Sequence, residues 1–285
     1  MNTPSRPRAT KIICTIGPAT DTSDMLGQLI EAGANVFRLN MSHSKHDWVR
    51  EVVFRIRRKA AELEANVAIL FDLQGPSIRT GDLAEPYHLK KGDTVEIRLG
   101  TAKPELPFST TVNYDGLLQD VQAGHTMVVD NGGILMRIAE VRPDRLICDV
   151  LTEGVFGSRR HINLPGVALR LPALTEKDLA DLAVAVECET DYVAMSFVRD
   201  AAHIAQLREH IDNLGGKAQI VAKIEDQQAV RHIDDIILAA DVIMVARGDL
   251  GIEVSIEELP IIQRRIVRHC HRLGRRCIVA THMLE

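Results

Sequence analysis

The chain reads Ala222-Lys223-Ile224-Glu225 at the end of one apolar run and Val245-Ala246-Arg247-Gly248-Asp249-Leu250-Gly251 at the end of the next. The runs begin at Gln219 and Val242, and such runs are typical of strands buried on both faces of a parallel sheet. Each run leads into polar and charged residues where strand becomes loop, and α/β barrels carry their chemistry at this end of their strands. The pattern predicts a site at the mouth of such a barrel.

Three charged residues of this stretch form a candidate cation site. Lys223 and Glu225 are two apart, so on a strand they point the same way. Asp249 follows the next strand and is expected to meet Glu225 at the mouth. Mg²⁺ (or Mn²⁺) takes few protein oxygens and fills its shell with water and substrate, so these residues suit a metal holding a phosphorylated or enolate-like anion. A structural ion pair is the alternative; three such residues at successive strand ends favour the site.

The composition narrows the class of protein. The 285 residues are 46% hydrophobic and 26% charged, which is ordinary for a globular protein. A net charge of -5 argues against a nucleic-acid partner. Five scattered cysteines without a CxxC pair indicate reduced thiols. No apolar run approaches the roughly 18 residues of a membrane span, and residues 1–10 lack the apolar core of a signal peptide. We expect a soluble, cytoplasmic protein with no membrane partner.

Two segments, residues 1–80 and 163–285, alternate strands with helices and predict one α/β barrel of the TIM (β/α)₈ type. Ser44 with Asp47, and Ser255 with Glu258, are spaced as capping boxes for two of the helices. We expect seven barrel strands, because the chain stops before an eighth could form. The expected strands cover residues 11–16, 35–39, 67–71, 192–197, 219–225, 242–246 and 277–280.

Residues 81–162 have a different hydrophobic pattern, which predicts a separate β-barrel-like domain inserted after the third strand. Helical periodicity disappears here, and turn signals such as Asn131-Gly132-Gly133 separate short β-like runs. Such an insert is able to close over a site and exclude water. The expected strands cover residues 95–99, 127–129, 134–138 and 145–150.

Six motifs, taken in order, resemble the pyruvate kinase family, which moves phosphate from phosphoenolpyruvate to ADP. The motifs span residues 11–18, 37–43, 72–80, 163–166, 222–225 and 244–253. The resemblance implies glycolytic phosphotransferase activity, phosphoenolpyruvate/pyruvate and ADP/ATP as ligands, and a homo-oligomer in the full-length form. The family's eighth barrel unit and C-terminal domain are absent. We therefore expect a fragment of a longer chain, or a gap filled by another chain.

The resemblance also assigns roles at the substrate. It implies that Glu225 and Asp249 bind Mg²⁺ and that Lys223 neutralises charge on the moving phosphoryl group and on the enolate. Arg38 would hold the substrate phosphate, for which its planar guanidinium is suited. Gly248 and Thr281 would contact the substrate, with Thr281 close to the site of enolate protonation. Taken singly, Arg38 as a rim ion-pair partner, Thr281 as a cap and Gly248 as a turn glycine are the alternatives.

The nucleotide is expected on the other side of the site. By the same resemblance, Arg79, Arg160, His43 and Asn40 lie near the nucleotide. Arg160 stands where the family usually has a lysine, which keeps the charge and alters the geometry.

A potassium site is implied at Asn40, Ser42, Asp72 and Leu73. The potassium-dependent form of the family has threonine at the last of these positions and glutamate where Ser77 stands, and the independent form has leucine and lysine. Leu73 supplies half of the independent pattern, and Ser77 supplies no substituting cation. We predict weak or absent potassium dependence.

Two other functions remain open at this point. One is a Mg²⁺-dependent lyase or aldolase that uses a pyruvate enolate on a similar barrel, against which the insert and the arginines argue. The other is an inactive, truncated pseudo-enzyme, which the missing eighth unit supports.

Overall fold

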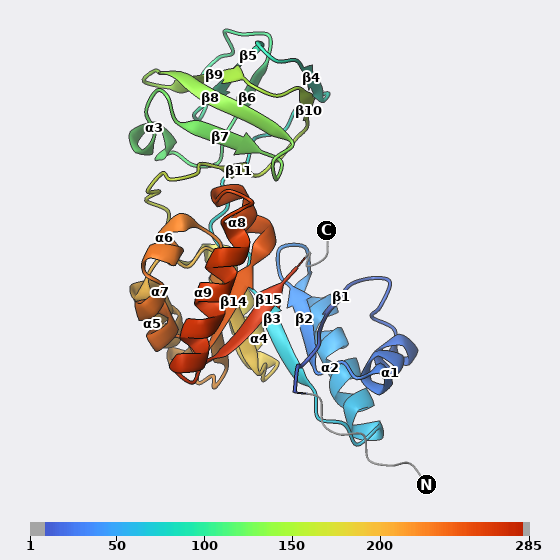
Figure 1. Ribbon diagram of the computed structural model, residues 1–285. Coiled ribbons are helices and arrows are strands. Elements are labelled where there is room, and N and C mark those ends of the chain that lie inside the picture. Colours follow the sequence, from blue (N-terminus) through green and yellow to red (C-terminus); the bar gives the residue numbers. More distant parts are fainter. Residues whose placement is uncertain (1–8, 282–285) are drawn as a thin grey trace.

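A computed structural model describes residues 9–281 and divides the molecule into a parallel α/β body and an all-β body (Figure 1). The α/β body is built on one sheet of seven parallel strands, which pair in the order in which they follow in the chain. The strands are β1 (Ile13–Ile16), β2 (Val36–Asn40), β3 (Ala68–Asp72), β12 (Tyr192–Met195), β13 (Gln219–Ile224), β14 (Val242–Ala246) and β15 (Arg276–Ala280). The predicted barrel-type fold, with its seven strands, is confirmed.

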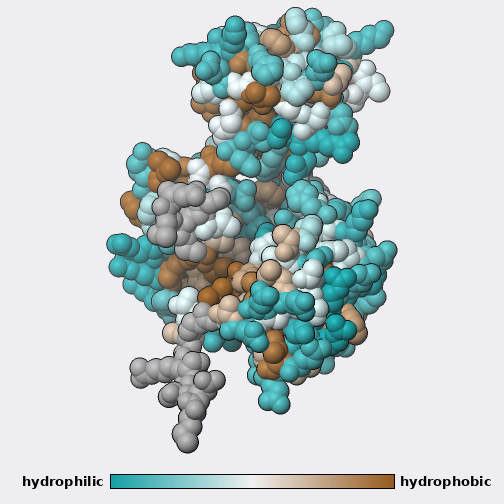
Figure 2. All heavy atoms as spheres, turned by 90° about the vertical axis from the view of Figure 1, so that its right-hand side faces the viewer, coloured by the Kyte–Doolittle hydropathy of each residue, from teal (hydrophilic) through white to brown (hydrophobic). Residues whose placement is uncertain are grey.

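The sheet curls without closing. Within residues 9–281, no pairing joins β1 to β15, so these two strands form its edges. Strand β14 is buried throughout, whereas no residue of its neighbour at the edge, β15, is fully buried. Figure 2 shows hydrophobic atoms in a hollow of this body, below the more hydrophilic insert.

Helices follow the strands and pack their apolar faces on the outside of the sheet. Leu26, Val52, Ile56 and Leu207 are among the fully buried side chains of this large core. The helices are α1 (Ser23–Ala32), α2 (His46–Glu62), α4 (Glu176–Glu187), α5 (Ala201–Asn213), α6 (Gln227–Arg231), α7 (Ile233–Ala239), α8 (Arg247–Glu253) and α9 (Leu259–Arg272). None of these helices has the length and apolar character needed to cross a bilayer within the described residues.

Both predicted capping boxes are wrong. Helix α2 begins after Lys45, and the Ser44 hydroxyl donates to the Asn40 carbonyl at 2.8 Å instead of capping the helix. Helix α9 begins after Glu258 without a side-chain cap, because residues 256–258 form a turn before it. The segment after β14, expected as a loop, is the short helix α8.

The all-β body lies between β3 and β12 and has its own core. Its main sheet has the order β11-β7-β8-β9-β5-β6, and β4 pairs with β10. The four strands predicted here are present, together with four shorter ones. The elements are β4 (Tyr87–Leu89), β5 (Thr94–Arg98), β6 (Ser109–Thr111), α3 (Leu117–Asp120), β7 (Thr126–Val129), β8 (Ile134–Val141), β9 (Arg145–Val150), β10 (Gly154–Phe156) and β11 (Ile162–Asn163). Figure 1 shows this body set apart from the parallel sheet and joined to it by two chain segments, one that follows β3 and one that leads to α4.

Candidate active site

The candidate site lies inside the curl of the parallel sheet, at the carboxyl ends of its strands. A small apolar cluster fills the inside of the curl, and in four strands a residue of this cluster precedes a polar residue by two positions. Residues two apart on a strand face the same side, so these polar side chains gather above the cluster. The pairs are Val36 with Arg38, Leu70 with Asp72, Ala194 with Ser196 and Val221 with Lys223.

Lys223 is at the centre of this group. Its Nζ lies 2.9 Å from Glu225 Oε1, 3.3 Å from Asp72 Oδ1 and 2.7 Å from Ser196 Oγ. Burial by itself lowers the pKa of the lysine, but the charges of Glu225 and Asp72 outweigh burial and raise that pKa above its ordinary value. The ammonium is therefore charged at neutral pH.

Glu225 is a buried carboxylate, 2% exposed. Its Oε2 accepts a hydrogen bond from the backbone N–H of Phe197 at 2.7 Å. Burial raises the pKa of Glu225 to about 7; the Lys223 charge opposes this change, and the nearby charge of Asp249 adds to it. The carboxylates of Glu225 and Asp249 repel each other, and a divalent cation bound between them would remove this repulsion.

Asp249 completes the acidic side of the site from helix α8. Its charge acts on Lys223, Glu225 and His161. Its carboxylate has no hydrogen-bond or ion-pair partner among residues 9–281. No group of three or more His, Cys, Asp or Glu side chains is placed to hold a metal in the described chain. Glu225 and Asp249 thus offer two carboxylates, and this donor set fits Mg²⁺, which keeps several positions for water and substrate.

Arg38 and Asp72 form the opposite wall. Arg38 Nε and Nη2 each lie 2.6 Å from Asp72 Oδ2, and Nη1 donates to Thr15 Oγ1 at 2.9 Å. Asp72 therefore lies between two cationic side chains, Arg38 and Lys223. The Leu73 side chain is 1% exposed and supplies no side-chain oxygen. The potassium role of these residues stays a prediction.

A cavity of about 450 Å³ joins the sheet mouth to the insert. Most of the site residues predicted from the sequence line it. These are Arg38, Asn40, Ser42, His43, Asp72, Leu73, Arg79, Arg160, Lys223, Glu225 and Asp249. The structure places Gly248 and Thr281 together beside this group, since a Cβ built on Gly248 would lie 3.8 Å from Thr281 Oγ1.

The insert supplies a basic rim across the cavity from the carboxylates. Arg79 donates to the Arg159 carbonyl at 3.1 Å, and Arg160 Nη1 lies 3.3 Å from Asp130 Oδ1. The bridge between Arg79 and His161 holds the two hinge segments of the insert side by side. Guanidinium groups in this position suit the phosphates of a nucleotide.

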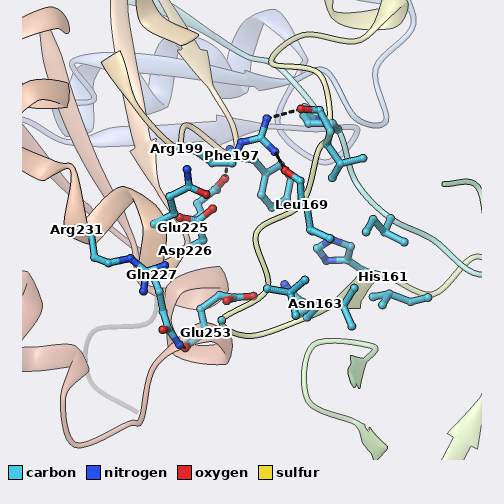
Figure 3. Close-up of a pocket in the computed structure, with 18 residues that line it drawn as sticks. His161, Asn163, Leu169, Phe197, Arg199, Glu225, Asp226, Gln227, Arg231 and Glu253 are labelled. Carbon is cyan, nitrogen blue, oxygen red and sulfur yellow. Dashed lines mark hydrogen bonds between the residues drawn. The ribbon is translucent and has the colours of Figure 1, made fainter. Parts of the chain in front are cut away.

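The residues of the site that were not predicted from the sequence include Ser196, Phe197 and His161. Phe197 and Glu225 lie next to each other in Figure 3. His161, near the C-terminal end of the insert, lines with them a second cavity of about 60 Å³. The rings of His161 and Phe197 are 5.8 Å apart between centroids. The signal available for Ser196 and Phe197 was their place at the end of the strand predicted over residues 192–197.

Comparison with known proteins finds relatives that match nearly the whole of this chain. The family model described as "Pyruvate kinase, barrel domain" matches residues 7–285. Plastidial pyruvate kinase 2 of Arabidopsis thaliana is 40% identical over 99% of this chain and 49% of its own length. Pyruvate kinase of Clostridium perfringens is 39% identical over 97% of this chain and 59% of its own.

Pyruvate kinase of Staphylococcus aureus, strain MRSA252, is 36% identical over 98% of this chain and 48% of its own. The chain thus spans about half the length of the curated relatives that it matches. The family match covers both segments of the parallel sheet and the insert between them. On this evidence the chain belongs to the pyruvate kinase family.

Proposed function

We propose that the protein transfers the phosphoryl group of phosphoenolpyruvate to ADP and releases pyruvate and ATP. The observation that carries this proposal is the arrangement around Lys223. One ammonium and two carboxylates, Glu225 and Asp249, share a cavity with arginines from the sheet and from the insert. Phosphoryl transfer depends chiefly on positioning and charge neutralisation, and this set of groups supplies both.

The roles follow from position. Glu225 and Asp249 would hold Mg²⁺ or Mn²⁺, which when bound neutralises charge on phosphoryl oxygens. Arg38 would bind the substrate phosphate, and Arg79, Arg160, His43 and Asn40 would bind the nucleotide. An oxygen of ADP forms the new bond to phosphorus as the bond from phosphorus to the enol oxygen breaks. Lys223 would stabilise the enolate that leaves. Carbon 3 of this enolate would then take up a proton near Thr281, which gives pyruvate.

Lys223→Met tests this assignment. A methionine fills similar space without the charge, so we expect pyruvate formation from phosphoenolpyruvate and ADP to fall by about 1,000-fold or more, given that such electrostatic groups contribute several kcal/mol to transition states. The measurement is a coupled assay of pyruvate release. Lys217→Met removes an exposed lysine just before β13 and serves as the matched control.

Two results would contradict the proposal: no pyruvate from the unaltered protein, or unchanged turnover in Lys223→Met. The enolate lyase or aldolase and the inactive pseudo-enzyme gain no support from the comparisons, whose relatives are named as pyruvate kinases.

We also propose weak or absent potassium dependence. A strong and specific activation by KCl over NaCl would disprove it.

A further inference from the structure

Two adjacent residues directly after β12 contact the two central groups of the site. Ser196 contacts Lys223 through its side chain, and Phe197 contacts Glu225 through its backbone N–H. The register explains this placement. Met195, the last residue of β12, pairs with Ala222, so the residue that follows it, Ser196, lies beside Lys223.

The hydrogen bonds of Ser196 have a defined direction. Its hydroxyl donates to the Leu73 carbonyl at 2.8 Å, and a hydroxyl has only one proton to donate. Toward Lys223 it therefore acts as an acceptor, at 2.7 Å from Nζ. Ser196 is 2% exposed, so water does not take this place.

The three acceptors around Lys223 differ in what they do to the ammonium. Glu225 and Asp72 are carboxylates and partly neutralise its charge. Ser196 is neutral, so it fixes the direction of one N–H group and leaves the charge intact. A group that must meet a developing anion needs both a fixed direction and its full charge.

The backbone next to Ser196 is held in an uncommon conformation. Phe197 has a φ of 55°, in the left-handed region that bulky residues seldom adopt. This conformation accompanies the hydrogen bond from its N–H to Glu225. Strained residues of this kind persist where the surrounding contacts require them, often at functional sites.

We propose that Ser196 is a positioning residue for phosphoryl transfer, and that its hydroxyl, held by the Leu73 carbonyl, fixes the direction of one N–H group of the Lys223 ammonium. It has this role only if the protein carries out the proposed reaction. The neighbouring Phe197 N–H orients Glu225 separately. Removing the serine hydroxyl is therefore expected to affect the lysine and to spare the carboxylate.

Ser196→Ala separates these two effects. A hydrogen bond to a charged group accounts for about 10- to 100-fold in rate, so we expect kcat with phosphoenolpyruvate and ADP to fall by that factor. The KM for phosphoenolpyruvate and the Kd for Mn²⁺ should each stay within about threefold, because a shift that small is under 1 kcal/mol and no binding group is removed. Ser196→Thr keeps the hydroxyl and should keep kcat within about fivefold on the same scale.

Ser109→Ala is the matched control, since it removes a buried hydroxyl that accepts from Arg98 in the insert, away from the cavity. Thermal melting of each variant shows whether it folds. Unchanged kcat in Ser196→Ala, a parallel loss of Mn²⁺ binding, or a threonine variant as slow as the alanine variant would each overturn the role of Ser196. An unaltered protein without turnover would instead refute the proposed function itself.

Discussion

Gly75 shows how closely the site is packed at the scale of single residues. Its φ is 72°, and a Cβ added there would lie 2.9 Å from Ser196 Cβ and 3.0 Å from Phe197 Cδ2. Both neighbours belong to the segment that holds Lys223 and Glu225. The backbone of Gly75 therefore occupies space that a side chain would take from the site.

Gly75→Ala should lower both stability and activity. We expect a loss of about 1–3 kcal/mol in the free energy of unfolding from overpacking and the positive φ, measured by urea denaturation. The control is Gly92→Ala, where φ is 93° and no atom lies within 4 Å of an added Cβ. If the two variants lose the same stability and Gly75→Ala keeps full activity, the close packing has no functional meaning.

The charged residues at the strand ends were predictable from the sequence, whereas the neighbouring Ser196 was not. Lys223, Glu225 and Asp249 stand out because charge follows apolar runs. Ser196 does not stand out, because its two hydrogen-bond partners, Leu73 and Lys223, are distant from it in the sequence. Such contacts depend on register, which a single sequence does not display.

Helix α4 links secondary structure to the site at the scale of elements. Asp178 lies in its first turn and is fully buried. One of its oxygens accepts from Thr175 N and Oγ1 at 2.8 and 2.6 Å, which completes a capping box. The other accepts from the backbone N–H of Gly75 at 3.0 Å. The start of α4 is thereby tied to the loop that follows β3.

Asp178→Ala should destabilise the protein by about 2–3 kcal/mol, because it removes a helix cap and leaves buried donors without a partner. Chemical denaturation measures the change. Glu176→Ala, an exposed acidic residue in the same turn, should change stability by less than about 0.5 kcal/mol. Equal effects of the two substitutions would show that Asp178 acts only through its charge near the helix start.

Elements with a clear period were predicted well, and short elements were not. The strands of the parallel sheet followed from their apolar runs. Helix α8 was missed because Gly248 and Gly251 lower helix propensity within seven residues. The capping boxes predicted at Ser44 and Ser255 failed because spacing alone does not show where the first helical turn begins.

At the scale of the whole molecule, the main feature is a parallel sheet that does not close. Strands β13 and β14 are covered on both faces, whereas β1 and β15 have a partner on one side only within residues 9–281. Edge strands expose N–H groups and open more readily than central ones. The site itself is built mainly on the central strands, which suits its need for fixed geometry.

Amide hydrogen exchange should follow this arrangement. We expect the amides of β13 and β14 to exchange most slowly and those of β1 and β15 to exchange at least about 100-fold faster, since local opening costs much less at an edge. Mass spectrometry of exchanged peptides makes the comparison. Equal protection of β14 and β15 would show that another segment or a second copy covers the β15 edge.

Mn²⁺ binding tests the central claim, that Glu225 and Asp249 hold the cation at which phosphoryl transfer takes place. Electron paramagnetic resonance titration of the protein should show one Mn²⁺ per chain, bound more tightly when phosphoenolpyruvate is present. Glu225→Gln and Asp249→Asn should each weaken binding by about 10-fold or more, on the scale of 1.4 kcal/mol per tenfold, while the exposed Glu257→Gln leaves it unchanged. Unchanged Mn²⁺ affinity in both site variants would contradict the claim.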